Sequence, residues 1–130
     1  MSKILVVDER LEVRELAQVS LEIGEHQVLA AENGQQALDL AWVEHPALIF
    51  LSITSSGGRE EMLEICRRLK TNPAIADIRI VVLATRQQTV DIQACLAAGA
   101  DDYFLKPFPP LHFLEKAEEV LGIGDISGQL

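Results

Sequence analysis

Two kinds of segment alternate along this chain. Short apolar runs rich in β-branched residues are typical of buried strands, and they occur at Ile4–Val7, Val28–Ala31, Ala47–Leu51, Ile78–Leu83 and Tyr103–Leu105. Between these runs, apolar residues recur at spacings of three and four, which is typical of helices with one buried face. The clearest sets are Val13, Leu16, Ala17 and Leu21; Met62, Ile65, Cys66 and Leu69; Ile92, Cys95, Leu96 and Gly99; and Leu111, Leu114, Ala117 and Leu121. The pattern predicts repeated strand–helix units, (βα)5.

Capping and proline signals locate two of the helix boundaries. Asn33 is a good N-cap for a helix over Gly34–Val43, because its short side chain can accept a hydrogen bond from a free backbone N–H. That helix should stop before His45-Pro46, since the residue before a proline disfavours helical geometry. Pro109 and Pro110 suit the first turn of the last helix, where a missing N–H costs nothing.

The predicted strands indicate the layering of the fold. Runs such as Ile4–Val7 and Ile80–Leu83 are apolar on both strand faces, so helices must cover both sides of a parallel sheet. Right-handed crossovers then give a doubly wound α/β fold. We expect one domain over residues 1–121, with residues 122–130 as a flexible tail or the start of a linker.

Composition narrows the classes of function. The 130 residues are 48% hydrophobic, enough for a core, and the net charge of −9 argues against direct nucleic-acid binding, which needs a basic face. No apolar run approaches the roughly 20 residues that span a bilayer. The start of the chain has no signal-peptide pattern. Two cysteines, Cys66 and Cys95, are expected to be buried thiols in the reducing cytoplasm.

Candidate chemistry should gather at one edge of the sheet, because ligands bind outside the carboxyl ends of parallel strands. The residues just past the predicted strands include two acids, hydroxyls and an ammonium group. They are Asp8 and Glu9 after the first strand, Ser52 after the third, Ala84-Thr85 after the fourth, and Lys106-Pro107 after the fifth.

Four stretches in order carry a family resemblance: KILVVDER, HPALIFLSI, EICRRLK and AAGADDYFLKPF. Over about residues 3–121, the sequence resembles the CheY-like receiver domains of bacterial two-component response regulators. The resemblance implies a flavodoxin-like five-stranded parallel sheet of order 2-1-3-4-5 with five helices, and a role in phosphorelay signal transduction.

The resemblance also implies roles for individual residues. Asp8 and Glu9 match the acid pair that helps to hold Mg²⁺, and Lys106 matches the lysine that contacts the phosphoryl group. Pro107 follows Lys106 in a bond that is usually cis in this family. Tyr103 matches the switch aromatic. For the switch hydroxyl, an ungapped count back from Lys106 falls on Ala84, and a gap of one residue brings Thr85 there.

The phosphoacceptor position departs from the family pattern, because it holds Ser52 in place of aspartate. A carboxylate is ionised at neutral pH, whereas a serine hydroxyl needs a general base before it attacks. With one carboxylate fewer, Mg²⁺ should bind weakly at most, and no other cofactor is expected. We expect Lys106 to pair with Asp8 in a metal-poor pocket. Trp42 and Val43 are expected to be packing residues.

These features favour a pseudo-receiver that works without phosphorylation, has no enzymatic activity and acts through protein–protein contact. In the family, the fourth helix, fifth strand and fifth helix form a docking face, here Val90–Ala98, Tyr103 and Leu111–Leu121. A protein partner, with a second copy of the chain among the candidates, should bind there. Two alternatives stay open: an Mg²⁺-dependent phospho-receiver with a non-standard acceptor, and a small-ligand sensor that uses the vacated pocket.

Overall fold

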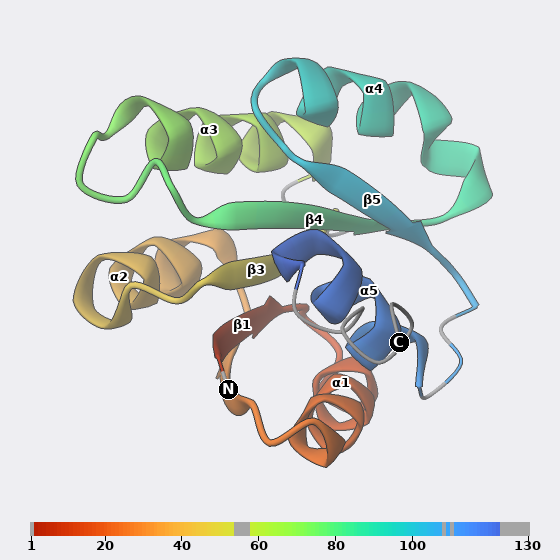
Figure 1. The fold of residues 1–130 in the computed structure, drawn as a ribbon. Helices are drawn as coiled ribbons and strands as arrows, with labels where there is room; N and C mark the ends of the chain where they lie inside the picture. Colours follow the sequence, from red (N-terminus) through yellow and green to blue (C-terminus); the bar gives the residue numbers. More distant parts are fainter. Residues whose placement is uncertain (1, 54–57, 108, 110, 123–130) are drawn as a thin grey trace.

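A computed structural model describes residues 2–53, 58–107, 109 and 111–122. Strands and helices alternate as the sequence pattern predicts (Figure 1). The strands are β1 (Lys3–Val7), β2 (Gln27–Ala31), β3 (Leu48–Ser52), β4 (Arg79–Ala84) and β5 (Asp102–Leu105). The helices are α1 (Leu11–Ile23), α2 (Gly34–Glu44), α3 (Gly58–Thr71), α4 (Thr89–Ala97) and α5 (His112–Leu121), with a short 3₁₀ helix over Arg86–Gln88 before α4.

All paired strands are parallel, and their order is β2-β1-β3-β4-β5. This order confirms the predicted doubly wound sheet. The central strand β3 is buried along its whole length, which fits its apolar sequence because a parallel sheet between helices has no solvent-facing side.

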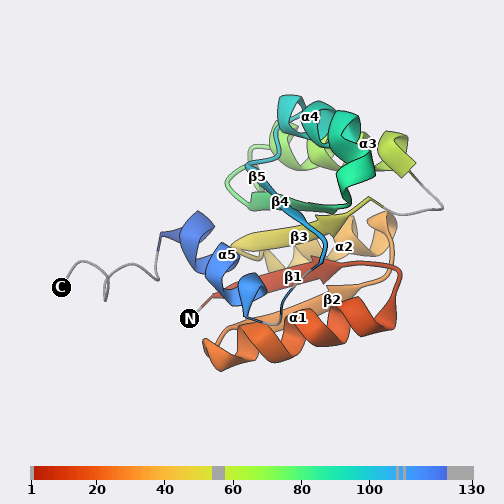
Figure 2. The same ribbon diagram turned by 90° about the vertical axis from the view of Figure 1, so that its right-hand side faces the viewer.

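Two hydrophobic clusters fill the space on either side of the sheet. Alternate residues of each strand serve the two clusters: Leu5 of β1 belongs to one cluster with α2, α3 and α4, and Ile4 to the other with α1 and α5. In Figure 1, α3 and α4 lie across the top of the sheet, with α1 and α5 below it. Figure 2 shows the same layers from the side, with α1 running beneath β1 and β2. Each face of the sheet is therefore sealed by its own layer of helices.

The boundary of α2 follows its capping signal. Asn33 is the N-cap, and its Oδ1 accepts a hydrogen bond of 3.0 Å from the backbone N–H of Gln36. The helix continues one residue beyond the prediction, to Glu44, and ends where His45 adopts a left-handed conformation with φ of 46°. The prediction of a capped helix ending before His45-Pro46 is confirmed.

Two predictions about the later helices are wrong. Helix α5 begins at His112, so Pro109 precedes it, and Leu111 is its exposed N-cap where we expected a core residue. Its buried residues are Phe113 and Ala117. Pro110 lies outside the described residues. Similarly, α4 ends at Ala97, and Gly99 forms the following turn with φ of 121°, a conformation that only glycine adopts easily.

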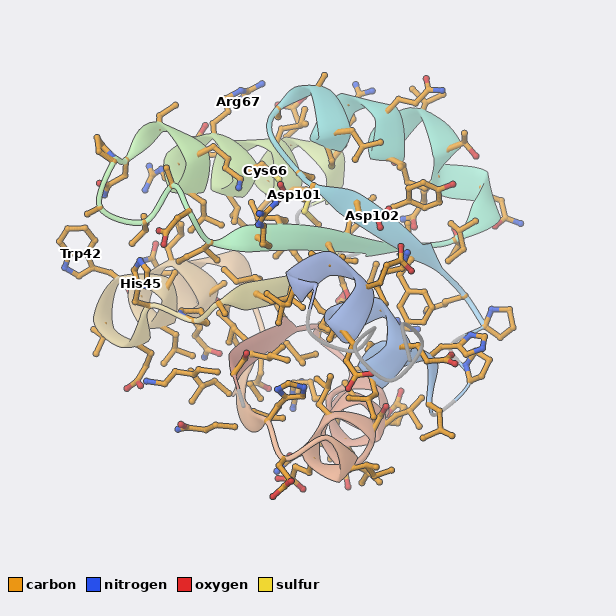
Figure 3. The ribbon with its side chains drawn as sticks, in the orientation of Figure 1. Trp42, His45, Cys66, Arg67, Asp101 and Asp102 are labelled. Atoms are coloured by element: carbon orange, nitrogen blue, oxygen red, sulfur yellow. The ribbon has the colours of Figure 1, made fainter. Side chains whose placement is uncertain are left out.

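An acidic pair fixes the start of β5 at the amino end of the sheet (Figure 3). One oxygen of Asp101 accepts a hydrogen bond of 2.8 Å from the backbone N–H of Ile80 and lies 3.2 Å from Nζ of Lys70. Asp102 pairs with Lys116 of α5 at 3.0 Å. The predicted candidate residues follow the other ends of the strands, so these ion pairs stabilise the fold away from that edge.

Trp42 and Val43 are not packing residues, contrary to our expectation. Their exposed fractions are 62% and 73%, and Figure 3 shows the Trp42 side chain projecting away from α2. The small residues Ala37 and Ala41 make the buried contact of this helix instead. Cys66 and Cys95 are free and buried, as predicted. None of the described helices has the length and apolar character that crossing a membrane requires.

Candidate functional site

The register of the sheet brings Asp8 and Ser52 together at the carboxyl edge. Val7 pairs with Leu51 across β1 and β3, so the next residues along the two strands, Asp8 and Ser52, are neighbours. Both are buried, with exposed fractions of 1% and 7%. The Ser52 hydroxyl donates a hydrogen bond of 2.5 Å to Oδ2 of Asp8.

Arg10 supplies the remaining hydrogen bonds to the Asp8 carboxylate. Its backbone N–H and its Nε donate to Oδ1 at 2.8 and 3.1 Å, and its Nη2 donates to Oδ2 at 3.1 Å. The guanidinium thus meets both carboxylate oxygens in the forked geometry that makes arginine–carboxylate pairs strong. The hydrogen bond to Asp8 raises the pKa of Arg10 above its ordinary value. The ion pair neutralises the buried charge of Asp8.

A second arginine holds the backbone of Asp8. Nη1 of Arg14, one turn further along α1, donates a hydrogen bond of 2.8 Å to the carbonyl oxygen of Asp8, and its Nη2 lies 3.8 Å from Glu32. Asp8 also donates its backbone N–H to the carbonyl of Ala31 at 3.1 Å. The position of Asp8 is therefore fixed from its side chain, its carbonyl and its amide.

The other candidate residues surround a cleft of about 400 Å³. Asp8, Glu9, Ser52, Ala84, Thr85 and Lys106 all line it, together with Arg10 and Gln88. Ala84 is the buried last residue of β4 and accepts a hydrogen bond of 3.0 Å from the backbone N–H of Lys106. Thr85 follows at the head of the 3₁₀ helix, where Oε1 of Gln88 accepts from its N–H at 2.8 Å. The Lys106–Pro107 peptide bond is cis.

The residues in this cleft do not fit a divalent cation in the arrangement described. Mg²⁺ prefers six oxygen ligands and usually takes one or two carboxylates from the protein. The described residues contain no group of three or more acidic, histidine or cysteine side chains that could hold a metal. The two carboxylate oxygens of Asp8 already accept hydrogen bonds from Arg10 and Ser52.

Comparison with known proteins identifies the family of this chain. Residues 4–118 match the model of the response regulator receiver domain. The chain belongs to the response regulator receiver family. It is 36% identical over 125 residues to the phosphate regulon transcriptional regulatory protein PhoB of Pseudomonas aeruginosa, covering 94% of this chain and 54% of that protein. It is also 36% identical over 119 residues to the response regulator MprA of Mycolicibacterium vanbaalenii, covering 92% of this chain and 50% of that protein.

Solved structures agree on the fold. A putative response regulator from Chloroflexus aurantiacus superposes with a TM-score of 0.83 at 24% identity, covering 93% of this chain and 98% of that one. A response regulator from Thermotoga maritima gives a TM-score of 0.80 at 28% identity, covering 92% and 97%. The receiver domain described here spans about half the length of the curated relatives it matches.

Tyr103 lies apart from the cleft of this receiver domain. It is the second residue of β5, pairs in register with Val82 and has an exposed fraction of 42%. The strand β5 lies at the edge of the sheet. Tyr103 is not among the residues that line the cleft with Asp8 and Ser52.

Sequence reasoning missed the two arginines of this receiver domain. Arg10 and Arg14 stand four residues apart in KILVVDERLEVRE, a spacing that brings side chains to one face of a helix. That spacing, directly after an acid at the end of a strand, is the signal that could have identified them. Asp8 makes an ion pair with Arg10, a partner that the sequence analysis did not predict, and the expected pairing of Asp8 with Lys106 stays a prediction.

Proposed function

We propose that this receiver domain works without phosphorylation and passes its signal through protein–protein contact. The observation that carries the proposal is the hydrogen bond from the buried Ser52 hydroxyl to Asp8. The position that the family resemblance assigns to the phosphoacceptor aspartate holds a neutral hydroxyl, whose proton is directed to a carboxylate already paired with Arg10. An acyl phosphate cannot form on such a side chain.

The environment of Ser52 also disfavours a phosphoserine ester. A serine becomes a useful nucleophile when an adjacent base takes its proton. Asp8 is the neighbouring carboxylate, and because it already accepts hydrogen bonds from the guanidinium of Arg10, it is a poor base for the Ser52 proton. A serine oxygen also sits one carbon back from the position of an aspartate oxygen, and a misplacement of about 1 Å can cost on the order of 10²-fold in rate.

This proposal predicts that the chain stays unmodified by small phosphodonors. After incubation with acetyl phosphate and Mg²⁺, intact mass spectrometry should give the mass of the unmodified protein, because no ionised oxygen at residue 52 is available to attack phosphorus. A receiver domain with the acceptor aspartate, treated in parallel, serves as the positive control. Stoichiometric addition of a phosphoryl group would instead support a non-standard acceptor and contradict the proposal.

The neutral Ser52 side chain and the pairing of Asp8 with Arg10 also bear on enzymatic activity and on cofactors. We infer that the domain has no enzymatic activity of its own and no cofactor, and that Mg²⁺ binds weakly at most. The free, buried thiols Cys66 and Cys95 suit the reducing cytoplasm, which is where we place the protein.

The partner face is proposed on α4, β5 and α5. Large hydrophobic side chains are exposed there, with exposed fractions of 67% for Val90, 42% for Tyr103 and 53% for Leu111. Only part of the docking face predicted from the sequence is exposed to a partner. Its buried residues are Ile92 and Cys95 of α4 and Phe113 and Ala117 of α5. The exposed apolar and aromatic residues are those that interfaces use as anchors.

A second copy of the chain is the first partner to test on this face. Sedimentation velocity over a range of concentrations should show self-association that Val90→Glu combined with Tyr103→Ala weakens by roughly tenfold or more, the loss typical of interface anchors. Trp42→Ala is the matched control, since Trp42 is as exposed as Val90 but lies on α2. A monomer at every concentration would eliminate the second copy as the partner.

A small-ligand sensor is the second candidate function, and the cleft is the observation that favours it. Its volume of about 400 Å³ falls within the range of small-molecule sites. A ligand in this cleft would raise the unfolding temperature of the natural chain, and a substitution that fills the cleft at Ala84 would abolish that rise.

A further inference from the structure

We propose that Arg10 is a built-in counter-ion that takes the place of a divalent cation at Asp8 and keeps such cations out of the cleft. The proposal deepens the proposed function, on which it rests in treating the cleft as unused for phosphoryl transfer. It assigns Arg10 a positioning role at the acidic end of β1.

The hydrogen bonds to Asp8 leave no open acceptor site on its carboxylate. An ionised carboxylate has about four lone-pair sites. Oδ1 accepts from the backbone N–H and Nε of Arg10, and Oδ2 accepts from Nη2 of Arg10 and from the Ser52 hydroxyl. A metal ion would need one of these oxygens at roughly 2.0–2.1 Å. It could bind only after Arg10 or Ser52 had been displaced.

The place of Arg10 in the chain makes this arrangement specific. Arg10 is the N-cap of α1 in an extended conformation, with φ of −96° and ψ of 126°, so its backbone and side chain both face the same carboxylate. Two of its three contacts come from the guanidinium. Replacement of the side chain therefore removes the cation and leaves the backbone hydrogen bond to Oδ1 in place.

Charge supports the same conclusion. A divalent cation at Asp8 would lie against the guanidinium, and because the Asp8 side chain is only 1% exposed while that of Arg10 is 40% exposed, water would screen the repulsion between the two cations only in part. Removing the Arg10 side chain takes away that positive charge and frees lone pairs on both oxygens. Asp8 would then offer its carboxylate to the cleft, and Mg²⁺ usually takes one or two carboxylates from a protein.

Arg14 provides a matched control. It carries the same charge, stands one turn away on α1 and also contacts Asp8, but through the backbone carbonyl. Its removal lowers the local positive charge by the same amount without exposing the carboxylate oxygens. The two variants therefore separate occupation of the carboxylate from a general change in charge.

Mn²⁺ is the probe, because its paramagnetism broadens the amide NMR signals of residues near the bound ion. Titrations would compare the natural chain with Arg10→Ala, Arg10→Gln and Arg14→Ala, with folding checked from the amide spectra of residues far from the cleft. We expect Arg10→Ala and Arg10→Gln to bind Mn²⁺ at Asp8 at least about tenfold more tightly than the natural chain, the scale of a lost charge-assisted pair. Arg14→Ala should stay within about threefold of the natural chain.

Three results would overturn the proposal: binding at Asp8 by the natural chain as tight as by the Arg10 variants, an equal gain in Arg14→Ala, or no gain in either Arg10 variant. These outcomes are distinguishable from failure of the proposed function. Phosphorylation of the natural chain would be seen as added mass, whereas the Mn²⁺ titration contains no phosphodonor.

Discussion

Ser52→Asp alone will leave this receiver domain largely unlabelled by acetyl phosphate and Mg²⁺, whereas the Ser52→Asp, Arg10→Ala double variant will be labelled on the order of tenfold faster or more. The single change supplies an ionised oxygen at residue 52. However, the guanidinium of Arg10 still binds both oxygens of Asp8. The same guanidinium would also attract the new carboxylate at residue 52. The double change supplies the acceptor and also releases the Asp8 carboxylate from the guanidinium.

Intact mass spectrometry as a function of time measures this difference. Ser52→Asp combined with Arg14→Ala is the control, because it removes an equal charge from α1 and leaves Arg10 on the carboxylate. Chelation of Mg²⁺ should abolish labelling of the active double variant. Rapid labelling of Ser52→Asp by itself would mean that the acceptor was the only part missing and that Arg10 presents no barrier.

Phe113→Ala should reduce the free energy of unfolding by about 3–5 kcal/mol, the usual cost of removing a large buried aromatic side chain. Phe113 is fully buried on α5. Its ring makes edge-to-face contacts with Phe50 of β3 and Phe104 of β5, at centroid separations of 5.3 and 5.2 Å, and such aromatic pairs add to the value of the buried area. Since small domains are stable by only about 5–15 kcal/mol, the variant should lose a large part of its stability.

Urea denaturation followed by circular dichroism checks this value through the shift of the midpoint. Trp42→Ala is the comparison, since it removes an even larger aromatic side chain from an exposed position on α2. Surface changes of that kind usually stay within about 0.5 kcal/mol. Equal losses in the two variants would show that ring size, and not burial against the sheet, sets the cost.

The sheet could be predicted because its strands are apolar on both faces. In Ile4–Val7 and Ile80–Leu83 every residue must be covered, and only a parallel sheet between two helical layers does this. The family resemblance supplied the strand order. Periodicity failed at Gly99 and Leu111, which keep the helical spacing but lie beyond the helix ends. A spacing rule contains no information about where capping stops a helix.

The sequence predicts where the residues of the candidate site gather, but it does not predict the ion pair between Asp8 and Arg10. Residues at the carboxyl ends of neighbouring strands must gather at one edge, so Asp8 and Ser52 could be brought together from sequence. Which cationic side chain pairs with Asp8 depends on side-chain rotamers and on the direction in which the chain enters α1. Lys106 and Arg10 both line the cleft, and the backbone N–H of Arg10 already binds Oδ1, which holds its guanidinium at short range.

The two arginines at the start of α1 also join that helix to the end of β1. Any shift of its first turn must break contacts from Arg10 to the Asp8 carboxylate and from Arg14 to the Asp8 carbonyl. Strand and helix therefore move as one body at this end of the domain. A protein that displaced α1 would therefore have to break these contacts or carry Asp8 with it, so this helix is mechanically coupled to the cleft although it lies outside the proposed partner face.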